Sequence, residues 1–232
     1  MAASIEVVVF DVNETLSDMR PIGGRFAAVG LPEHAFTTWF ASVLRDGFAA
    51  AAAGGMITFR DLAAGNLAAM LEAHGLPPES RDAQVAHVLS GLADLHVHPD
   101  VPPGLRSLAA AGMRLVTLTN GSSALSETMF ARAGVLDLFE HRLSVEDVGR
   151  WKPAPEPYRY AAERCDVDPQ RVALVAVHPW DVRGAQQAGL RGVWVNRSGG
   201  TYPAYLPAPD ATVPSVAEVG HAVARLSEEG RD

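Results

Sequence analysis

The sequence predicts an α/β protein, in which a parallel sheet with crossover helices is interrupted early by an all-helical insertion. Three observations predict this class. A short apolar run near the N-terminus is rich in β-branched residues, as in a strand buried on both faces. The segment from about residue 21 to 96 has only helical periodicity. The remainder alternates helical stretches with apolar runs, which favours parallel strands joined by right-handed crossovers.

The first strand is expected over residues 5–10, and it ends on an acid, Asp11. In the helical insertion, apolar residues recur at three- and four-residue spacing, with Gly or Pro breaks between segments. These segments cover 36–54, 59–77 and 80–95. We therefore expect a core domain made of residues 1–16 and 97–232 and a helical domain made of residues 17–96.

After the insertion, helical and apolar segments alternate to the end of the chain. Strands are expected at 114–120, 171–177 and 192–196. Helices are expected at 105–111, 123–133, 157–165 and 182–188, with a last one after residue 210 that frays. The spacing of these elements is that of repeated βα units.

Composition and charge limit the class of protein. With 232 residues, 48% of them apolar, the chain can bury one core and a smaller unit. The 27 acidic residues outnumber 19 basic ones without any Lys/Arg block, which argues against a nucleic-acid partner. Cys165 is the only cysteine, so an internal disulfide is excluded. No stretch reaches the roughly 18 apolar residues of a membrane span, and the start lacks a signal peptide's basic region, so we expect a soluble, cytoplasmic protein.

Polar residues follow the predicted strands at the edge where open parallel sheets bind ligands. The residues at these positions, including one in the loop 149–158, are Asp11, Thr119, Asn120, Lys152, His178 and Asp181. Together they offer carboxylates, an ammonium group, a hydroxyl and an amide. This is the inventory of a site in which an Asp nucleophile is restrained by a cation.

Four motifs occur in order along the chain: "FDVNETL", "LTNGS", "KPAPEPY" and "HPWDVRGAQQAGL…WVNRSG". Their order resembles the haloacid dehalogenase superfamily, and within it the type II L-2-haloacid dehalogenases, over nearly the full length. The resemblance implies a Rossmann-like core with a helical cap inserted after the first strand. It also implies a metal-independent hydrolase that needs no cofactor.

The resemblance implies that Asp11 attacks the carbon that bears the halogen and forms an ester, which water then hydrolyses. Lys152 would keep Asp11 ionised, and Asp181 would hold Lys152 and position the water. Thr15 and Tyr158 match the family's hydroxyl-bearing positions. The residues expected at the substrate are Val12, Asn13, Trp39, Phe40, Arg45, Thr119, Asn120, His178 and Trp180.

Asn13 favours attack on carbon over phosphoryl transfer. The phosphatases of the superfamily carry a second Asp two residues after the nucleophile, where it acts as general acid and base. An amide can do neither, but a halide other than fluoride leaves without a proton. Val177, at the end of its strand, offers no side-chain oxygen to Mg²⁺. A magnesium-dependent small-molecule phosphatase and a catalytically idle binding protein stay open as alternatives.

The sequence departs from the family pattern in three respects. The family's halide-binding arginine follows a cap tryptophan, but here Phe40 follows Trp39, so Arg45 either replaces that arginine or faces solvent. Ala176 and His178 stand where the family has serine and asparagine, and we expect His178 in the wall of the site or turned outward. Asn13-Glu14 replaces an aromatic residue and a glycine. The expected partner is a short 2-haloacid, with neither nucleic acid nor membrane, and a homodimer stays open.

Overall fold

The structure, a computed structural model, describes residues 4–228. In this part of the chain a six-stranded sheet has the order β5-β4-β1-β6-β7-β8. Its neighbouring strands are all parallel. The strands are β1 (Val7–Phe10), β4 (Arg114–Thr119), β5 (Phe139–Ser144), β6 (Val172–Ala176), β7 (Arg191–Val195) and β8 (Ala211–Val213). The predicted fold class is therefore confirmed, and β1 lies between β4 and β6, which carry further site residues.

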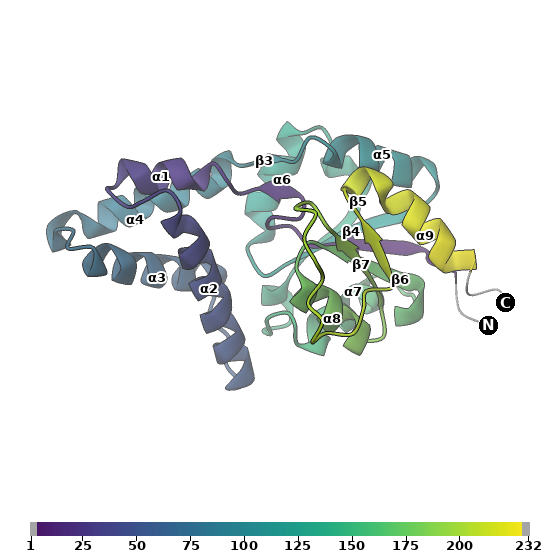
Figure 1. Cartoon of the computed structure of the whole chain (residues 1–232). Helices are drawn as coiled ribbons and strands as arrows, with labels where there is room; N and C mark the ends of the chain where they lie inside the picture. Colours follow the sequence, from purple (N-terminus) through teal and green to yellow (C-terminus); the bar gives the residue numbers. More distant parts are fainter. Residues whose placement is uncertain (1–3, 229–232) are drawn as a thin grey trace.

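Helices cover both faces of the sheet (Figure 1). They are α5 (Val101–Ala110), α6 (Ser123–Arg132), α7 (Pro155–Arg164), α8 (Pro179–Gln187) and α9 (Val219–Glu228). Successive side chains of β1 point to opposite faces of the sheet, and each face is covered by helices, which explains the apolar run. Val8 packs in the core that includes Leu105 of α5, and Val9 packs in the core that includes Val182 of α8. Both faces of β1 are thus buried, as its composition predicts.

A helical insertion lies between two short strands, β2 (Ser17–Asp18) and β3 (His96–Val97), which pair antiparallel. The insertion consists of α1 (Ile22–Ala28), α2 (Ala35–Ala52), α3 (Phe59–Ala73) and α4 (Arg81–Ser90), and Figure 1 shows it beside the sheet. Short 3-10 helices cover Pro78–Ser80, Gly91–Asp94, Leu136–Leu138, Val145–Asp147, Pro169–Arg171 and Val216–Glu218. The predicted boundary between the two domains falls at the β2–β3 ribbon, and it stays a prediction.

Besides the short strands β2 and β3, three elements were absent from the sequence-based expectation, each for a physical reason. The strand β5 lies at one edge of the sheet and carries charged residues such as Glu140 and Arg142, so it lacks the apolar run of a central strand. At the other edge, β8 is only three residues long. The helix α1 contains Gly23 and Gly24, which weaken the helical pattern, although Ile22 and Phe26 are buried four residues apart.

Helix α8 begins at Pro179, before the expected residue 182. Asp181 therefore lies in the first turn of the helix, and His178 takes the N-cap position. A carboxylate in the first turn is favoured by the helix dipole. The last expected helix is α9, and residues 229–232 lie outside the described part. Within residues 4–228, none of the helices has the length and apolar character that crossing a membrane requires.

Candidate active site

A buried lysine joins two buried carboxylates at the carboxyl edge of the sheet. The Nζ atom of Lys152 donates to Asp11 Oδ1 at 2.9 Å and to Asp181 Oδ2 at 2.6 Å. Its third hydrogen bond goes to the carbonyl oxygen of Leu118 in β4 at 2.9 Å. All three ammonium protons therefore have acceptors. A buried ammonium group needs such complete pairing to remain charged.

The ends of β1 and β4 set the position of this network. Asp11 follows β1, and its backbone N–H still donates to Val175 of β6 at 3.1 Å, which fixes the carboxylate at the sheet edge. Asn120, after β4, accepts from the backbone N–H of Lys152 at 2.9 Å and donates to the Lys152 carbonyl at 3.4 Å. The amide of Asn120 thus holds the lysine loop. Its expected contact with substrate stays a prediction.

The charges in the network shift each other's titration. Burial disfavours the ionised form of Asp11, but the charge of Lys152, with smaller contributions from His178 and Thr15, outweighs burial and holds the pKa of Asp11 well below its usual range. Burial also opposes the charge of Lys152, yet Asp11 and Asp181 raise the pKa of its ammonium group. At neutral pH, Asp11 is a carboxylate and Lys152 is an ammonium ion.

Asp181 lies between the lysine and a phenol. Tyr158 donates its hydroxyl proton to Asp181 Oδ1 at 2.6 Å. Burial, and the negative charge of Asp11 nearby, raise the pKa of Asp181 against the opposing effect of Lys152. Burial and the Asp181 carboxylate also raise the pKa of Tyr158 well above its usual value. A carboxylate whose pKa is raised is a better proton acceptor, which suits a general base.

The second oxygen of Asp11 faces β6. Thr15 donates its hydroxyl proton to Asp11 Oδ2 at 2.6 Å, and the backbone N–H of Val177 donates to Thr15 Oγ1 at 3.0 Å. Nδ1 of His178 lies 3.1 Å from the same Oδ2 atom, and Nε2 of His178 lies 2.9 Å from Glu14 Oε2. Sequence reasoning did not assign Glu14 to the site. The inward histidine, of the two expected orientations, is the one observed.

A cavity of about 40 Å³ lies between the sheet edge and the helical insertion. Val12, Asn13 and Thr119, all expected at the substrate, line it. Among the described residues that line this cavity, none carries an ionisable side chain; the others are Ser17, Phe59, Leu92, Leu95, Gly121, Ser122, Leu125, Ser126 and Met129. Its walls are thus apolar on the insertion side and contain hydroxyls and amides on the core side.

Aromatic side chains from α2 meet those of α8 on the other side of the nucleophile. His178 stacks on Trp180 with ring centroids 5.0 Å apart, and Phe40 packs against His178 at 6.4 Å. Trp180 also contacts Phe48 of α2 at 4.9 Å. Phe40 and Trp180 therefore form the wall around His178, in agreement with their expected positions near the site.

Two expected site residues lie elsewhere. Trp39 is fully buried inside the helical insertion, where its indole N–H donates to the Ala63 carbonyl oxygen at 2.9 Å. Arg45 has 67% of its side chain exposed and forms an ion pair with Asp46. Arg45 thus faces solvent, which is one of the two orientations that the sequence left open, and the structure does not bring it to the cavity.

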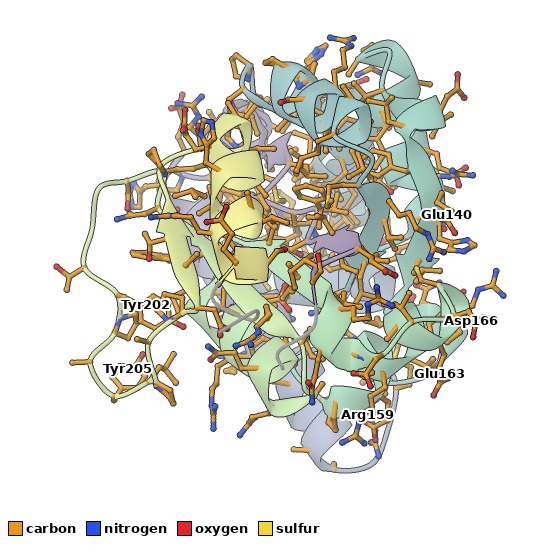
Figure 2. The ribbon with its side chains drawn as sticks, turned by 90° about the vertical axis from the view of Figure 1, so that its right-hand side faces the viewer. Glu140, Arg159, Glu163, Asp166, Tyr202 and Tyr205 are labelled. Atoms are coloured by element: carbon orange, nitrogen blue, oxygen red, sulfur yellow. The ribbon has the colours of Figure 1, made fainter. Side chains whose placement is uncertain are left out.

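A further cluster of side chains with metal-binding atoms lies away from this edge. Ligand atoms of Glu140, His141 and Cys165 fall within 4.8 Å of one another. Glu140 is already engaged by the guanidinium of Arg114 through two hydrogen bonds of 2.7 and 2.6 Å, and Figure 2 shows Glu140 at the periphery of the molecule. This cluster is therefore separate from the site around Asp11.

Comparisons with known proteins agree with this geometry. Haloacetate dehalogenase H-2 of Moraxella sp. (strain B) is 35% identical over 126 residues, which is 54% of this chain and 56% of that protein. The (S)-2-haloacid dehalogenase 1 of Pseudomonas sp. (strain CBS-3) is 28% identical over 195 residues, covering 83% of this chain and 85% of that protein. The alignments with the first relatives thus span little more than half of their length.

Solved structures match over more of the chain. The L-2-haloacid dehalogenase RSc1362 superposes with a TM-score of 0.87 at 28% identity, covering 96% of this chain and 100% of that chain. The L-2-haloacid dehalogenase from Xanthobacter autotrophicus superposes with a TM-score of 0.81 at 25% identity, covering 95% and 98%. The profile of the family described as haloacid dehalogenase-like hydrolase matches residues 5–189. The resemblance inferred from the four motifs is therefore confirmed, and the chain belongs to the haloacid dehalogenase-like hydrolases.

Proposed function

We propose that the protein is a hydrolytic dehalogenase that acts on short 2-haloacids through an ester on Asp11. One observation carries this proposal above the others: Lys152 holds the Asp11 carboxylate ionised, and the next two residues, Val12 and Asn13, line a small cavity whose described lining contains no ionisable side chain. Such a site offers an ionised nucleophile and, in the described lining of the cavity, no acid that could protonate a leaving group. Displacement of a chloride, bromide or iodide needs no proton, whereas departure of an alkoxide does.

The reaction has two steps. In the first, an oxygen of Asp11 forms a bond to the carbon that bears the halogen, and the halide leaves with the electron pair of the broken bond. In the second, water attacks the ester at the side-chain carbonyl carbon of Asp11. Asp181 accepts a proton from that water, and the 2-hydroxyacid leaves as the Asp11 carboxylate is restored.

The core side of the cavity supports binding of a substrate carboxylate. Helix α6 starts at Ser123, and, within the described chain, its N-cap Ser122 makes no side-chain cap. Backbone N–H groups in the first turn of a helix attract an anion. Ser122 and Thr119 line the same cavity and add hydroxyl groups. With a volume of about 40 Å³, the cavity favours haloacetate and other short acids over long ones.

The helical insertion is proposed to act as a cap over the site. Trp151, beside Lys152, donates its indole N–H to the Ile57 carbonyl oxygen of the insertion at 2.8 Å. Arg150 donates to the carbonyl oxygen of Ala51 at 2.8 Å. These contacts join the lysine loop to the insertion, so closure of the cap would exclude bulk water from Asp11 while the ester forms.

A magnesium-dependent phosphatase is less well supported. Lys152 lies between the two buried carboxylates and occupies the acceptors that a hard cation would need. Asn13 provides neither an acid nor a charged ligand. The lysine network therefore does not fit a magnesium site, and the proposed mechanism includes no metal or cofactor.

The deciding experiment incubates the purified protein with fluoroacetate, chloroacetate, bromoacetate, 2-chloropropionate and an aryl phosphate, with and without EDTA. We expect halide release that EDTA does not change, and no release of phosphate. Asp11→Asn should abolish halide release while the circular dichroism spectrum stays unchanged, because an amide is a very poor nucleophile. Phosphate release that EDTA stops, or turnover by a variant shown not to have deamidated, would contradict the proposal.

A labelled single turnover tests the ester directly. With enzyme in excess and H₂¹⁸O as solvent, the label should enter Asp11 and not the product, because water attacks the carbonyl carbon of the ester. Mass spectrometry of the peptide containing Asp11 measures this. The remaining proposals are a small-molecule partner and a reducing, cytoplasmic location, for which the single cysteine, Cys165, is the supporting feature.

A further inference from the structure

A cluster of metal-binding side chains lies outside the site around Asp11. One ligand atom each of Glu140, His141 and Cys165 falls within 4.8 Å of the others. Glu140 and His141 belong to β5, the edge strand of the sheet, and Cys165 is the C-cap residue of α7, which contacts that strand. The cluster thus offers a carboxylate, an imidazole and a thiol where a strand and a helix meet. The proposed mechanism uses none of the three.

A bulge in β5 brings two of these side chains together. Consecutive residues of a strand normally point to opposite faces of the sheet. Leu115 of β4 pairs with Phe139 of β5. The next residue, Val116, pairs with His141, so Glu140 is an extra residue without a partner in the ladder. Bulges redirect side chains and are frequent beside functional sites. Nε2 of His141 accordingly lies only 3.5 Å from Glu140 Oε1.

The third side chain is fixed at the end of α7. Cys165 is buried in the core beneath the helix, in the cluster that includes Leu143 of β5. The next residue, Asp166, has a φ of 54°, in the left-handed region that non-glycine residues seldom adopt, so the chain turns directly after the cysteine. Figure 2 shows Asp166 and Glu140 on the same side of the molecule. The thiol therefore has a fixed position, and acidic side chains lie on its outer side.

Arg114 orients the carboxylate and leaves it able to bind a cation. Its guanidinium donates to the two oxygens of Glu140 at 2.7 and 2.6 Å. A carboxylate oxygen has two lone pairs, so each oxygen keeps one free. Outer groups that hold a ligand in this way are common around metal ions. The negative charge of Asp166 acts on Arg114 and offsets its positive charge. A divalent cation would then be balanced by the carboxylate of Glu140 and the thiolate of Cys165.

The ligand types favour zinc. Mg²⁺ and Ca²⁺ prefer oxygen ligands, whereas thiolate, imidazole and carboxylate all bind Zn²⁺. Zinc–ligand bonds of about 2.0–2.3 Å place tetrahedral ligands about 3.3–3.8 Å apart. The contact of 3.5 Å between His141 and Glu140 lies in this range. A separation of 4.8 Å needs a closure of about 1 Å to reach it. Rotation of these two side chains, which are 24% and 37% exposed, can supply that movement.

We propose that Glu140, His141 and Cys165 form a zinc site in which water is the fourth ligand. On binding, the thiol releases its proton to solvent and the sulfur forms a bond to Zn²⁺, while the imidazole and the carboxylate each donate a lone pair. No oxidation state changes. The ion joins the edge strand β5 to the end of α7 and so stabilises the folded chain. The site is independent of the proposed function, because it includes no residue of the lysine network.

Titration with Co²⁺, which gives tetrahedral sites a visible spectrum, tests the proposal. The purified protein is treated with EDTA, kept reduced with a phosphine and desalted before Co²⁺ is added. We expect one equivalent to bind, with a sulfur-to-cobalt charge-transfer band in the near ultraviolet and the intense visible bands of tetrahedral cobalt. Zn²⁺ should displace the cobalt and remove both features. At a zinc concentration about 100-fold above the Kd, the Tm should rise by about 5–10 °C.

Each ligand is tested by its own substitution. Cys165→Ser should abolish the charge-transfer band. His141→Ala and Glu140→Gln should each weaken binding by about 10-fold or more, at least as much as the loss of an outer partner of a ligand. His221→Ala is the matched control and should leave binding unchanged, because His221 pairs with Glu218 on the exposed side of α9. Circular dichroism of each metal-free variant checks that it folds.

The results decide between the alternatives. Absence of binding, or a spectrum and affinity that Cys165→Ser or His141→Ala leaves unchanged, would overturn the site. An affinity that Glu140→Gln leaves unchanged would remove Glu140 from the ligand set and overturn the three-ligand site. Binding without a rise in Tm would overturn the stabilising role. Halide release enters none of these measurements, so failure of the zinc site and failure of the proposed dehalogenase activity are distinguishable.

Discussion

Replacing Lys152 by methionine should destabilise the fold by about 3–5 kcal/mol, because it leaves two buried carboxylates without their cation. The Nζ atom lies 2.9 Å from Asp11 Oδ1 and 2.6 Å from Asp181 Oδ2, and the ammonium group is fully buried. At an effective dielectric constant of about 20, each contact is worth about 6 kcal/mol of Coulomb attraction. The cost of desolvating three ions offsets much of this attraction, so the net loss is smaller than the sum of the contacts.

The destabilisation should depend on pH with a definite sign. In the wild type, the folded-state pKa of Asp11 is lower than in the unfolded chain, so its contribution to stability is present above about pH 4 and is lost as the pH falls. In Lys152→Met, Asp11 and Asp181 repel each other and at least one takes up a proton. That group then has a raised folded-state pKa, and its contribution is lost as the pH rises. The difference between variant and wild type should therefore be largest at neutral pH.

Urea unfolding followed by tryptophan fluorescence measures this difference at about pH 7.5 and about pH 5, on either side of the region where a perturbed carboxylate titrates. The double variant Lys152→Met with Asp181→Asn is the matched control, since it removes one carboxylate along with the cation and should recover part of the stability. A loss below about 1 kcal/mol, as for an exposed ion pair, or one that is equal at both pH values, would refute the reasoning.

Three further substitutions test the helical insertion. A Cβ atom at Gly47 of α2 would lie 2.5 Å from ring atoms of Trp151. Gly47→Ala should therefore destabilise the fold by about 1–3 kcal/mol through overpacking, and it should lower the rate of ester formation. The control is Gly65→Ala in α3, where the space is open, and this change should stabilise the fold by up to about 1 kcal/mol. Equal effects of the two alanines in urea unfolding would argue against the contact. Arg45→Ala should leave halide release within about twofold of the wild type, because the side chain is exposed; a loss of about 10²-fold would instead assign it a direct role at the halide.

The sequence was sufficient to predict the residues that converge on the nucleophile. Asp11 and His178 follow apolar runs that form parallel strands, Thr119 is the last residue of another such strand, and the carboxyl ends of parallel strands meet at one edge. Lys152 in the loop 149–158 and Asp181, three residues after His178, were expected at the same edge, and the match of their motifs to a family then gave each a role. These predictions required only which strand each residue follows, and not the conformation of any side chain.

The other features of the site could not be predicted, because they depend on side-chain direction and on local backbone conformation. Thr119 ends β4 and Asn120 follows it directly, yet only Thr119 lines the cavity, while the Asn120 amide binds the backbone of Lys152. The pattern of polar residues after a strand does not distinguish these two uses. The direction of Arg45 on α2 depends on how the insertion packs against the core, which its helical periodicity does not specify.

Glu14 shows the same limit, and its position helps to explain why the preceding residue, Asn13, is neutral. Asn13 lines the substrate cavity, but Glu14, with its left-handed backbone, directs its carboxylate to His178 on the opposite side of Asp11. An acid at position 13 would repel a substrate carboxylate and would serve a leaving group that needs a proton. At position 14 the acid instead faces the imidazole of His178, whose other nitrogen lies 3.1 Å from Asp11 Oδ2. The turn after β1 thus keeps negative charge out of the lining of the cavity and places it beside a histidine on the opposite side of the nucleophile.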